Sequence, residues 1–308
     1  MIRLLVIVSV LLTSCQLFTP AEPVIARLVE HNIGTSTGTV QGQSIAKSTN
    51  NKMASSEAES ADNSGEIVSW FDIPYAQPPV GELRWKAPRT LQSPERIVVE
   101  QDVTACVQKA SRYGGASGEG IVGSEDCLYL DIRAPADFAT KQYPVMFWIH
   151  GGANTTGLKD YYDFTALVAS QDVVVVTINY RLGALGWFTH PAIQGLQEGI
   201  DKASNFGTLD IIESLKWVQK NIHLFGGEAS NVTIFGESAG GHNVFALLAS
   251  PMANGLFHKA ISQSGYTTSA PQESAYNLND ADPLIKRGSW QIVNKILDKP
   301  QSSYSVDE

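Results

Sequence analysis

The sequence has few basic residues and lacks the glycine patterns of nucleotide-binding turns. Its 22 Lys and Arg residues stand against 31 Asp and Glu residues, and the formal net charge is −9. No basic stripe is present that would displace counterions from phosphate, and this argues against a nucleic-acid partner. Neither a dinucleotide-binding pattern nor a P-loop occurs in the 308 residues. The composition, with 43% hydrophobic and 17% charged residues, is that of a globular protein.

The first fifteen residues predict an export signal. One positive charge at Arg3 precedes an apolar run over residues 4–12, which is too short for a permanent membrane-spanning helix. The small residues before Cys15 resemble the lipobox of bacterial lipoproteins, in which this cysteine is acylated. Residues 1–15 would then be a lipoprotein-type signal and residues 16–31 a tether, with Gln16 favouring the outer membrane over retention elsewhere in the periplasm. An ordinary cleaved signal, giving a secreted protein, is the alternative.

Cysteines are scarce, and their number limits how they can be used. Of the three, Cys15 is the expected lipid site, which leaves Cys106 and Cys127. Export permits a disulfide between these two, and it would enclose a glycine-rich loop over residues 113–123. Two unpaired thiols are the alternative.

Strand and helix patterns alternate from residue 129 onward, which predicts an α/β sheet with helices on its faces. The valine run at 173–176 is typical of a strand buried on both faces. Residues 47–65 are polar and predict a solvated loop. The expected strands are 38–45, 67–71, 128–133, 145–149, 172–179, 231–235 and 260–263, and the expected helices are 210–221, 241–250 and 283–297.

Residues 236–240 read Gly-Glu-Ser-Ala-Gly and lie between an apolar run and a helix-like stretch. A G-x-S-x-G sequence between strand and helix forces a strained turn, in which flanking glycines let the two backbones pass closely while the serine hydroxyl points outward. The pattern therefore predicts Ser238 as a nucleophile for acyl chemistry. Glu237, next to it, is expected to orient neighbouring groups.

A glycine pair supplies candidate donors for the negative charge that such chemistry generates. A carbonyl attacked by serine becomes a tetrahedral oxyanion, and preorganised N–H groups stabilise it. Gly151 and Gly152 follow the expected strand 145–149, where backbone amides can approach a ligand closely. With the amide of Ala239 they would form a three-donor pocket. Taken alone, a glycine pair after a strand is also typical of a plain turn.

Besides the glycine and serine motifs, six further segments form a recognisable set: residues 73–81, 83–85, 124–130, 179–183, 205–210 and 225–227. With these motifs in this order, the chain resembles over residues 32–270 the type-B carboxylesterases, relatives of the cholinesterases and bacterial para-nitrobenzyl esterases. The resemblance implies an α/β-hydrolase fold, with a central, mostly parallel sheet flanked by helices. It also implies a small-molecule carboxylic ester substrate, an acyl-serine intermediate, and neither metal nor organic cofactor. Cys106 and Cys127 would be the family's first disulfide, and Arg84 with Glu125 a structural ion pair.

The C-terminal part departs from that family, which uses a serine, a glutamate and a histidine in that order. After Ser238 only His242 and His258 occur, and both precede every downstream acidic residue. We therefore expect residues 32–308 to be an incomplete hydrolase domain whose C-terminal portion is missing, with little turnover by the chain itself. His242 is expected to have a packing or capping role. A catalytically inactive, truncated or adhesion-type binding module with the same fold is the alternative function.

Overall fold

The structure, a computed structural model, describes residues 31–45, 66–93, 95, 97–98, 105–269, 274–275 and 288–299. The expected signal, the expected lipid site at Cys15 and the polar loop 47–65 lie outside these residues. His31, the last residue of the expected tether, begins the first strand.

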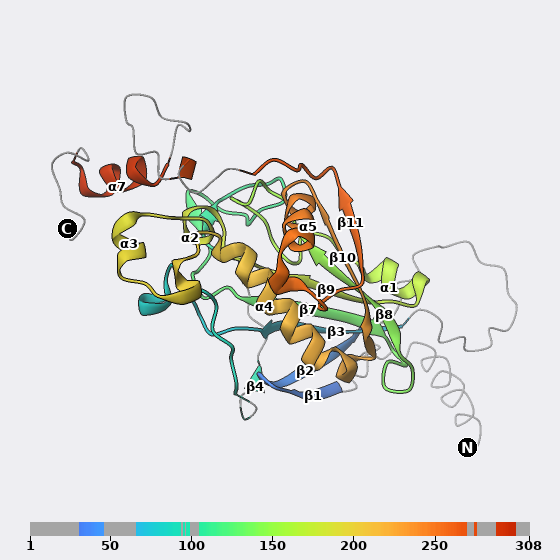
Figure 1. Cartoon of the computed structure of the whole chain (residues 1–308). Coiled ribbons are helices and arrows are strands. Elements are labelled where there is room, and N and C mark those ends of the chain that lie inside the picture. The colour runs from blue at the N-terminus through green and yellow to red at the C-terminus, as the bar shows by residue number, and fades with distance from the viewer. Residues whose placement is uncertain are drawn as a thin grey trace, which may run out of the picture.

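Within the described residues, a nine-stranded mixed sheet forms the centre of the fold, in the order β1-β2-β3-β7-β9-β8-β10-β11, with β4 paired to β2 (Figure 1). Strands β9, β8, β10 and β11 are parallel to one another, whereas β1, β2, β3, β7 and β9 pair antiparallel. The predicted strands are all present, with ends that differ by a few residues. The bounds are β1 His31–Thr35, β2 Gly38–Ile45, β3 Ile67–Pro74, β4 Ile97–Val98, β7 Tyr129–Pro135, β8 Tyr143–Ile149, β9 Val174–Ile178, β10 Gly227–Glu237 and β11 Lys259–Gln263.

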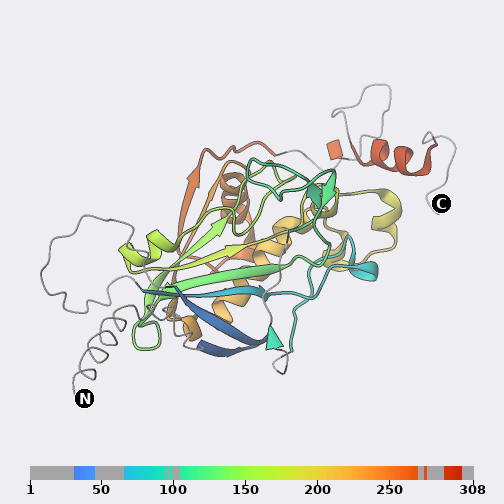
Figure 2. The same cartoon turned by 180° about the vertical axis from the view of Figure 1, so that it is seen from behind.

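Helices cover both faces of the sheet. Helices α4 and α5 lie on one face and α1 on the other, as the front and back views show (Figures 1 and 2). Helix α4 begins four residues earlier than predicted, and α7 begins at 289, after the extended residue Gly288, while residues 283–287 of the predicted helix lie outside the described residues. No helix within the described ranges combines the length and apolarity needed to cross a bilayer. The bounds are α1 Thr165–Gln171, α2 Gly183–Gly186, α3 Pro191–Gly195, α4 Phe206–Asn221, α5 Ala239–Ala249 and α7 Ser289–Leu297, with short 3₁₀ turns at Gly81–Leu83, Gly199–Lys202, Ile222–Phe225 and Pro251–Ala253.

Strand β9 shows why its sequence is a continuous apolar run. Val174 and Val176 belong to the large core cluster on the α4 and α5 side. Val175, between them, packs with Val168 of α1 in a second cluster on the opposite face. Because successive side chains of a strand point to opposite faces, a strand covered on both sides needs apolar residues at every position.

Candidate active site

Ser238 lies in the sharp turn between β10 and α5. Its backbone angles are φ 57° and ψ −121°, a conformation that costs a residue with a side chain about 1–3 kcal/mol. Two hydrogen bonds hold the turn: the Ser238 N–H donates to the Gln263 carbonyl at 2.8 Å, and the Ser238 carbonyl accepts from the His242 N–H at 3.0 Å. The side chain is half-buried, so solvent reaches it. The strained turn predicted from the sequence is present.

Two glycines make this turn sterically feasible. A Cβ at Gly236 would lie 2.6 Å from the Gly240 carbonyl oxygen. A Cβ at Gly240 would lie 2.1 Å from the Ile149 carbonyl oxygen. Any side chain at either position would push strand and helix apart, which explains the Gly-x-Ser-x-Gly spacing physically.

The end of β8 brings the predicted donor glycines beside the serine. Ile149 pairs with Gly236 across the two parallel strands, so the residues that follow each strand meet at the same edge. A Cβ at Gly151 would lie 3.3 Å from Ser238 Cβ and 3.0 Å from a Glu237 carboxylate oxygen. Gly151, Glu237 and Ser238 therefore adjoin one another in space.

The other two expected donors, Gly152 and Ala239, directly follow Gly151 and Ser238 in the sequence. Gly152 has φ +96°, and its carbonyl accepts the Thr155 and Thr156 N–H groups at 3.0 Å each in a tight turn. Ala239 is fully buried at the first turn of α5, directly after Ser238. The N-terminus of that helix adds a partial positive charge next to the serine.

His150 is a buried, neutral histidine at the start of the loop that carries the donor glycines, residues 150–158, which we call the donor loop. It is 3% exposed, its ring stacks on Tyr180 at 4.3 Å, and its Nδ1 lies 2.9 Å from the Gly151 carbonyl oxygen. Burial lowers the pKa of His150 to about 4, against a smaller opposing effect of the Gly151 hydrogen bond. The neutral ring can thus donate Nδ1–H to the Gly151 carbonyl and fix the Gly151–Gly152 peptide, whose N–H is one of the candidate donors.

Acid is expected to destabilise the protein through His150. The unfolded chain binds a proton near pH 6.5 and the folded chain only near pH 4, so stability is lost as pH falls across that window. The difference corresponds to about 3 kcal/mol. Urea unfolding between pH 7 and 4 should show a shallower acid loss in His150→Gln. His223→Gln, at an exposed position, is the control, and equal slopes for all three proteins would refute the assignment.

A pair of asparagine side chains ties the donor loop to α5. The side-chain amides of Asn154 and Asn243 pair reciprocally, with N···O distances of 2.9 and 3.4 Å. The Tyr180 hydroxyl donates to the His150 carbonyl at 2.6 Å and lies 3.3 Å from Asn154 Oδ1. Burial raises the pKa of Tyr180, which therefore stays a donor. The sequence did not single out Asn154 or Asn243, because nothing in either local pattern indicates a partner 89 residues away.

A buried ion cluster, also missed in the sequence, anchors the far end of the same loop. Lys159 Nζ lies 3.0 Å from Asp72 and 2.8 Å from Asp131, and all three side chains are at most 4% exposed. Burial alone would lower the pKa of Lys159, but the two carboxylates outweigh it and raise that pKa. Burial raises the pKa of Asp131 and outweighs the opposing effect of the Lys159 ammonium. The cluster joins the loop to β3 and β7.

The two histidines after the serine have structural partners. His242 Nδ1 lies 2.7 Å from the Tyr266 carbonyl oxygen, and its ring stacks on Tyr266 at 4.2 Å. His258 Nδ1 accepts the Val232 N–H at 3.2 Å. The arrangement of His242 agrees with the packing role predicted for it, and His258 is likewise held by a backbone group.

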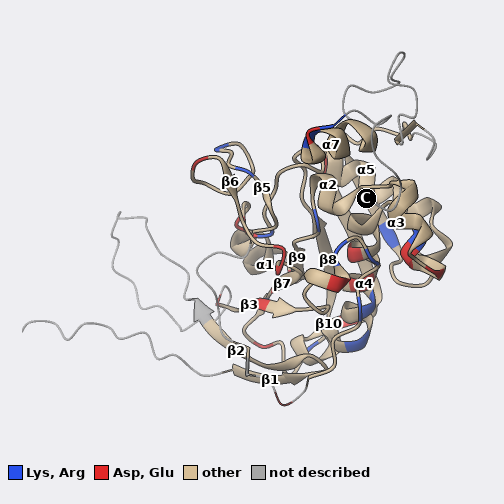
Figure 3. Cartoon of the chain, turned by 90° about the vertical axis from the view of Figure 1, so that its left-hand side faces the viewer, with Lys and Arg blue, Asp and Glu red and all other residues tan. Residues whose placement is uncertain are grey.

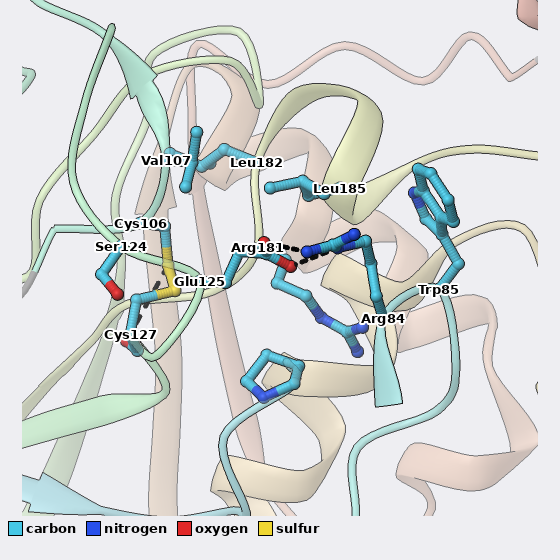
Figure 4. Close-up of a pocket in the computed structure, with 11 residues that line it drawn as sticks. Arg84, Trp85, Cys106, Val107, Ser124, Glu125, Cys127, Arg181, Leu182 and Leu185 are labelled. Carbon is cyan, nitrogen blue, oxygen red and sulfur yellow. Dashed lines mark hydrogen bonds and ion pairs between the residues drawn. A yellow bond between two sulfur atoms is a disulfide. The ribbon is translucent and has the colours of Figure 1, made fainter. Parts of the chain in front are cut away.

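The disulfide and a small pocket lie apart from this site. Cys106 and Cys127 are bonded, and Arg84 and Glu125 form the predicted ion pair with two contacts of 2.6 Å. These four residues line a pocket whose close-up shows the ion pair beside the disulfide (Figure 4). Ser238 does not line it. Around α3 and α4, acidic and basic segments lie beside one another on the side shown in Figure 3.

The sheet order and the strained serine turn are those of an α/β hydrolase. A model of the carboxylesterase family matches residues 30–293. The chain therefore belongs to the carboxylesterase family.

Individual relatives and solved structures agree. The chain is 44% identical over 221 residues to the para-nitrobenzyl esterase of Bacillus subtilis, covering 70% of this chain and 43% of that protein. It is 38% identical over 275 residues to carboxylesterase 3 of Homo sapiens, covering 86% and 43% respectively. The solved structure of a thermophilic PNB esterase superposes with a TM-score of 0.67 at 36% identity, over 90% of this chain and 50% of that one. The chain spans less than half the length of these two curated relatives.

Proposed function

We propose that the full-length protein hydrolyses carboxylic esters through an acyl-serine intermediate on Ser238. The observation that carries the proposal is the junction between the strained serine turn and the glycine loop, where a Cβ at Gly151 would lie 3.3 Å from Ser238 Cβ. A serine presented in this way beside unencumbered backbone amides is suited to attack on a carbonyl carbon.

In the first step the Ser238 oxygen attacks the ester carbonyl and a base takes its proton. The carbonyl oxygen gains negative charge and accepts hydrogen bonds from the amides of Gly151, Gly152 and Ala239. Collapse of this intermediate expels the alcohol and leaves an acyl group on Ser238, which water then removes by the same route. Glu237, whose carboxylate adjoins Gly151, would orient the groups around the serine.

The proposal assigns the base and its carboxylate partner to residues outside these 308. In both His242 and His258 the Nδ1 nitrogen is engaged with a backbone group, which favours structural roles for these two histidines. We therefore expect the 308-residue chain by itself to turn over esters far more slowly than a full-length protein. Equal rates for the two would refute this assignment.

Covalent labelling tests the proposal directly. A fluorophosphonate probe reacts with an activated serine and leaves a stable adduct. We expect a para-nitrophenyl ester to be hydrolysed by the full-length protein and the probe to modify the peptide containing Ser238, with loss of hydrolysis in proportion to labelling. Absence of both would favour an inactive or adhesion-type module, and modification of another serine would refute the assignment of Ser238 as the nucleophile.

For location, we propose export and lipid attachment at Cys15, which holds the enzyme at the bacterial outer membrane. The support is the sequence pattern alone. Incorporation of radioactive palmitate that disappears in Cys15→Ala is the expected result, and an unlabelled wild-type protein found in the medium would favour a secreted form.

A further inference from the structure

Gln108 links the disulfide loop, residues 106–127 between the two bonded cysteines, to the donor loop. Its side chain is 3% exposed and its amide makes four hydrogen bonds. Nε2 donates to the carbonyls of Cys106 at 3.0 Å and Gly157 at 2.9 Å. Oε1 accepts the N–H groups of Gly157 at 3.0 Å and Ala116 at 3.2 Å. This is the full capacity of a side-chain amide, and two of the four bonds hold both backbone groups of one residue.

That residue, Gly157, lies against the donor loop. It has φ +142°, and a Cβ there would lie 2.0 Å from His150 Nδ1 and 2.9 Å from the Gly151 carbonyl oxygen. The backbone of Gly157 therefore fills the space beside the same imidazole nitrogen that contacts Gly151. A displacement of Gly157 would release the His150 ring and, with it, the orientation of the Gly151 peptide.

The other side of Gln108 is the disulfide loop. Gln108 begins the hairpin of β5 (Gln108–Lys109) and β6 (Ile121–Val122), which projects from the body of the protein (Figure 3). Tyr113 in this hairpin is 89% exposed and Ile121 is 71% exposed. A Cβ at Gly115 would lie 2.8 Å from Gln108 Oε1 and 3.2 Å from Thr156 Cβ. A largely solvated loop is thus fixed to the donor loop at one buried amide.

We propose that Gln108 is a positioning residue: through Gly157 and His150 it holds the Gly151 and Gly152 amides in the direction required to stabilise the oxyanion. The inference rests on the proposed esterase function. It adds that the geometry of the donors depends on a side chain from the disulfide loop, 43 positions before Gly151.

The test compares Gln108→Met with Gln219→Met in the full-length protein. Methionine keeps the shape of glutamine and removes its hydrogen bonds. Gln219 is a matched control, because its Nε2 donates to two backbone carbonyls, of Ala229 and Leu256, both at 2.9 Å and away from the site. The readouts are amide hydrogen exchange of residues 150–158 and steady-state ester hydrolysis.

In Gln108→Met we expect exchange of residues 150–158 to rise about tenfold. We expect kcat to fall about 10- to 100-fold with KM within about twofold, because misdirected donors weaken the transition state more than the ground state. Affinity for a trifluoromethyl ketone, which forms an oxyanion on the serine, should fall with kcat. The Gln219→Met variant should change none of these.

Unchanged exchange in Gln108→Met would overturn the inference. Faster exchange with the kcat and KM of the control would overturn the positioning role, leaving only a structural one. Failure of the proposed function looks different, since the wild-type protein itself would neither hydrolyse esters nor react with a fluorophosphonate; the exchange result would then decide alone whether Gln108 holds the loop.

Discussion

Replacing Ser238 with alanine in the full-length protein is expected to lower kcat for para-nitrophenyl ester hydrolysis by about 10⁴- to 10⁶-fold. The reason is that the acyl intermediate requires this oxygen, and the remaining donors can only stabilise slow attack by water. The fold should survive for two reasons. Alanine and serine each carry one Cβ, so the strain of this backbone conformation is similar for both, and the hydrogen bonds that hold the turn come from the main chain. Initial rates and circular dichroism measure the two effects.

Ser214→Ala is the control for this experiment. Ser214 is fully buried in α4, and its hydroxyl donates to the Ile211 carbonyl at 2.8 Å, so the variant removes a serine without touching the turn. It should retain wild-type kcat. Ester hydrolysis that persists in Ser238→Ala at more than about a tenth of the wild-type rate would mean that another residue is the nucleophile.

The second large effect concerns stability. Lys159→Met removes the one ammonium between Asp72 and Asp131 and leaves two carboxylates that are at most 3% exposed. Breaking a buried ion pair by removing one partner costs about 3–5 kcal/mol, because the remaining buried charge has lost its counterion. Urea unfolding at pH 7 should show this loss in the free energy of unfolding.

Acid should partly rescue the Lys159→Met variant. Without the lysine, which lowers the pKa of Asp131, burial should raise the pKa of that carboxyl in the folded state further above its value in the unfolded chain, so the folded state binds a proton more tightly as pH falls. The deficit relative to wild type should therefore shrink between pH 7 and 5. Lys141→Met is the matched control: its ion pair with Asp137 lies at the surface, with the lysine side chain 65% exposed, so water already solvates both charges and the loss of stability should be small. Equal losses in the two variants would contradict the account of the cluster.

The parts of the fold that depend on local pattern were predictable from the sequence. The valine run of β9 and the Gly-x-Ser-x-Gly turn each carry their structural cause within a few residues, namely burial on both faces and the close passage of strand and helix. The antiparallel half of the sheet was not predicted, because pairing direction is set by partners distant in sequence. Helix α1 was also missed, since only Val168 of its seven residues is buried and its apolar pattern is weak.

The same distinction applies to the site. Ser238 and Gly151 follow strands with recognisable ends, and parallel pairing brings the two ends together. Gln108 and Lys159 had no such signal. A glutamine or lysine in isolation indicates an exposed surface position, and only the tertiary structure shows that each is buried among partners from other segments. These residues support the site through contacts that no single stretch of sequence contains.

The most direct test of the central claim is a crystal structure of the full-length protein after reaction with a fluorophosphonate. The account predicts a phosphorus atom bonded to Ser238 Oγ, with one phosphonyl oxygen about 3 Å from the amide nitrogens of Gly151, Gly152 and Ala239. An adduct on Ser238 whose oxygen points away from all three amides, or an unmodified Ser238 in an active enzyme, would contradict it.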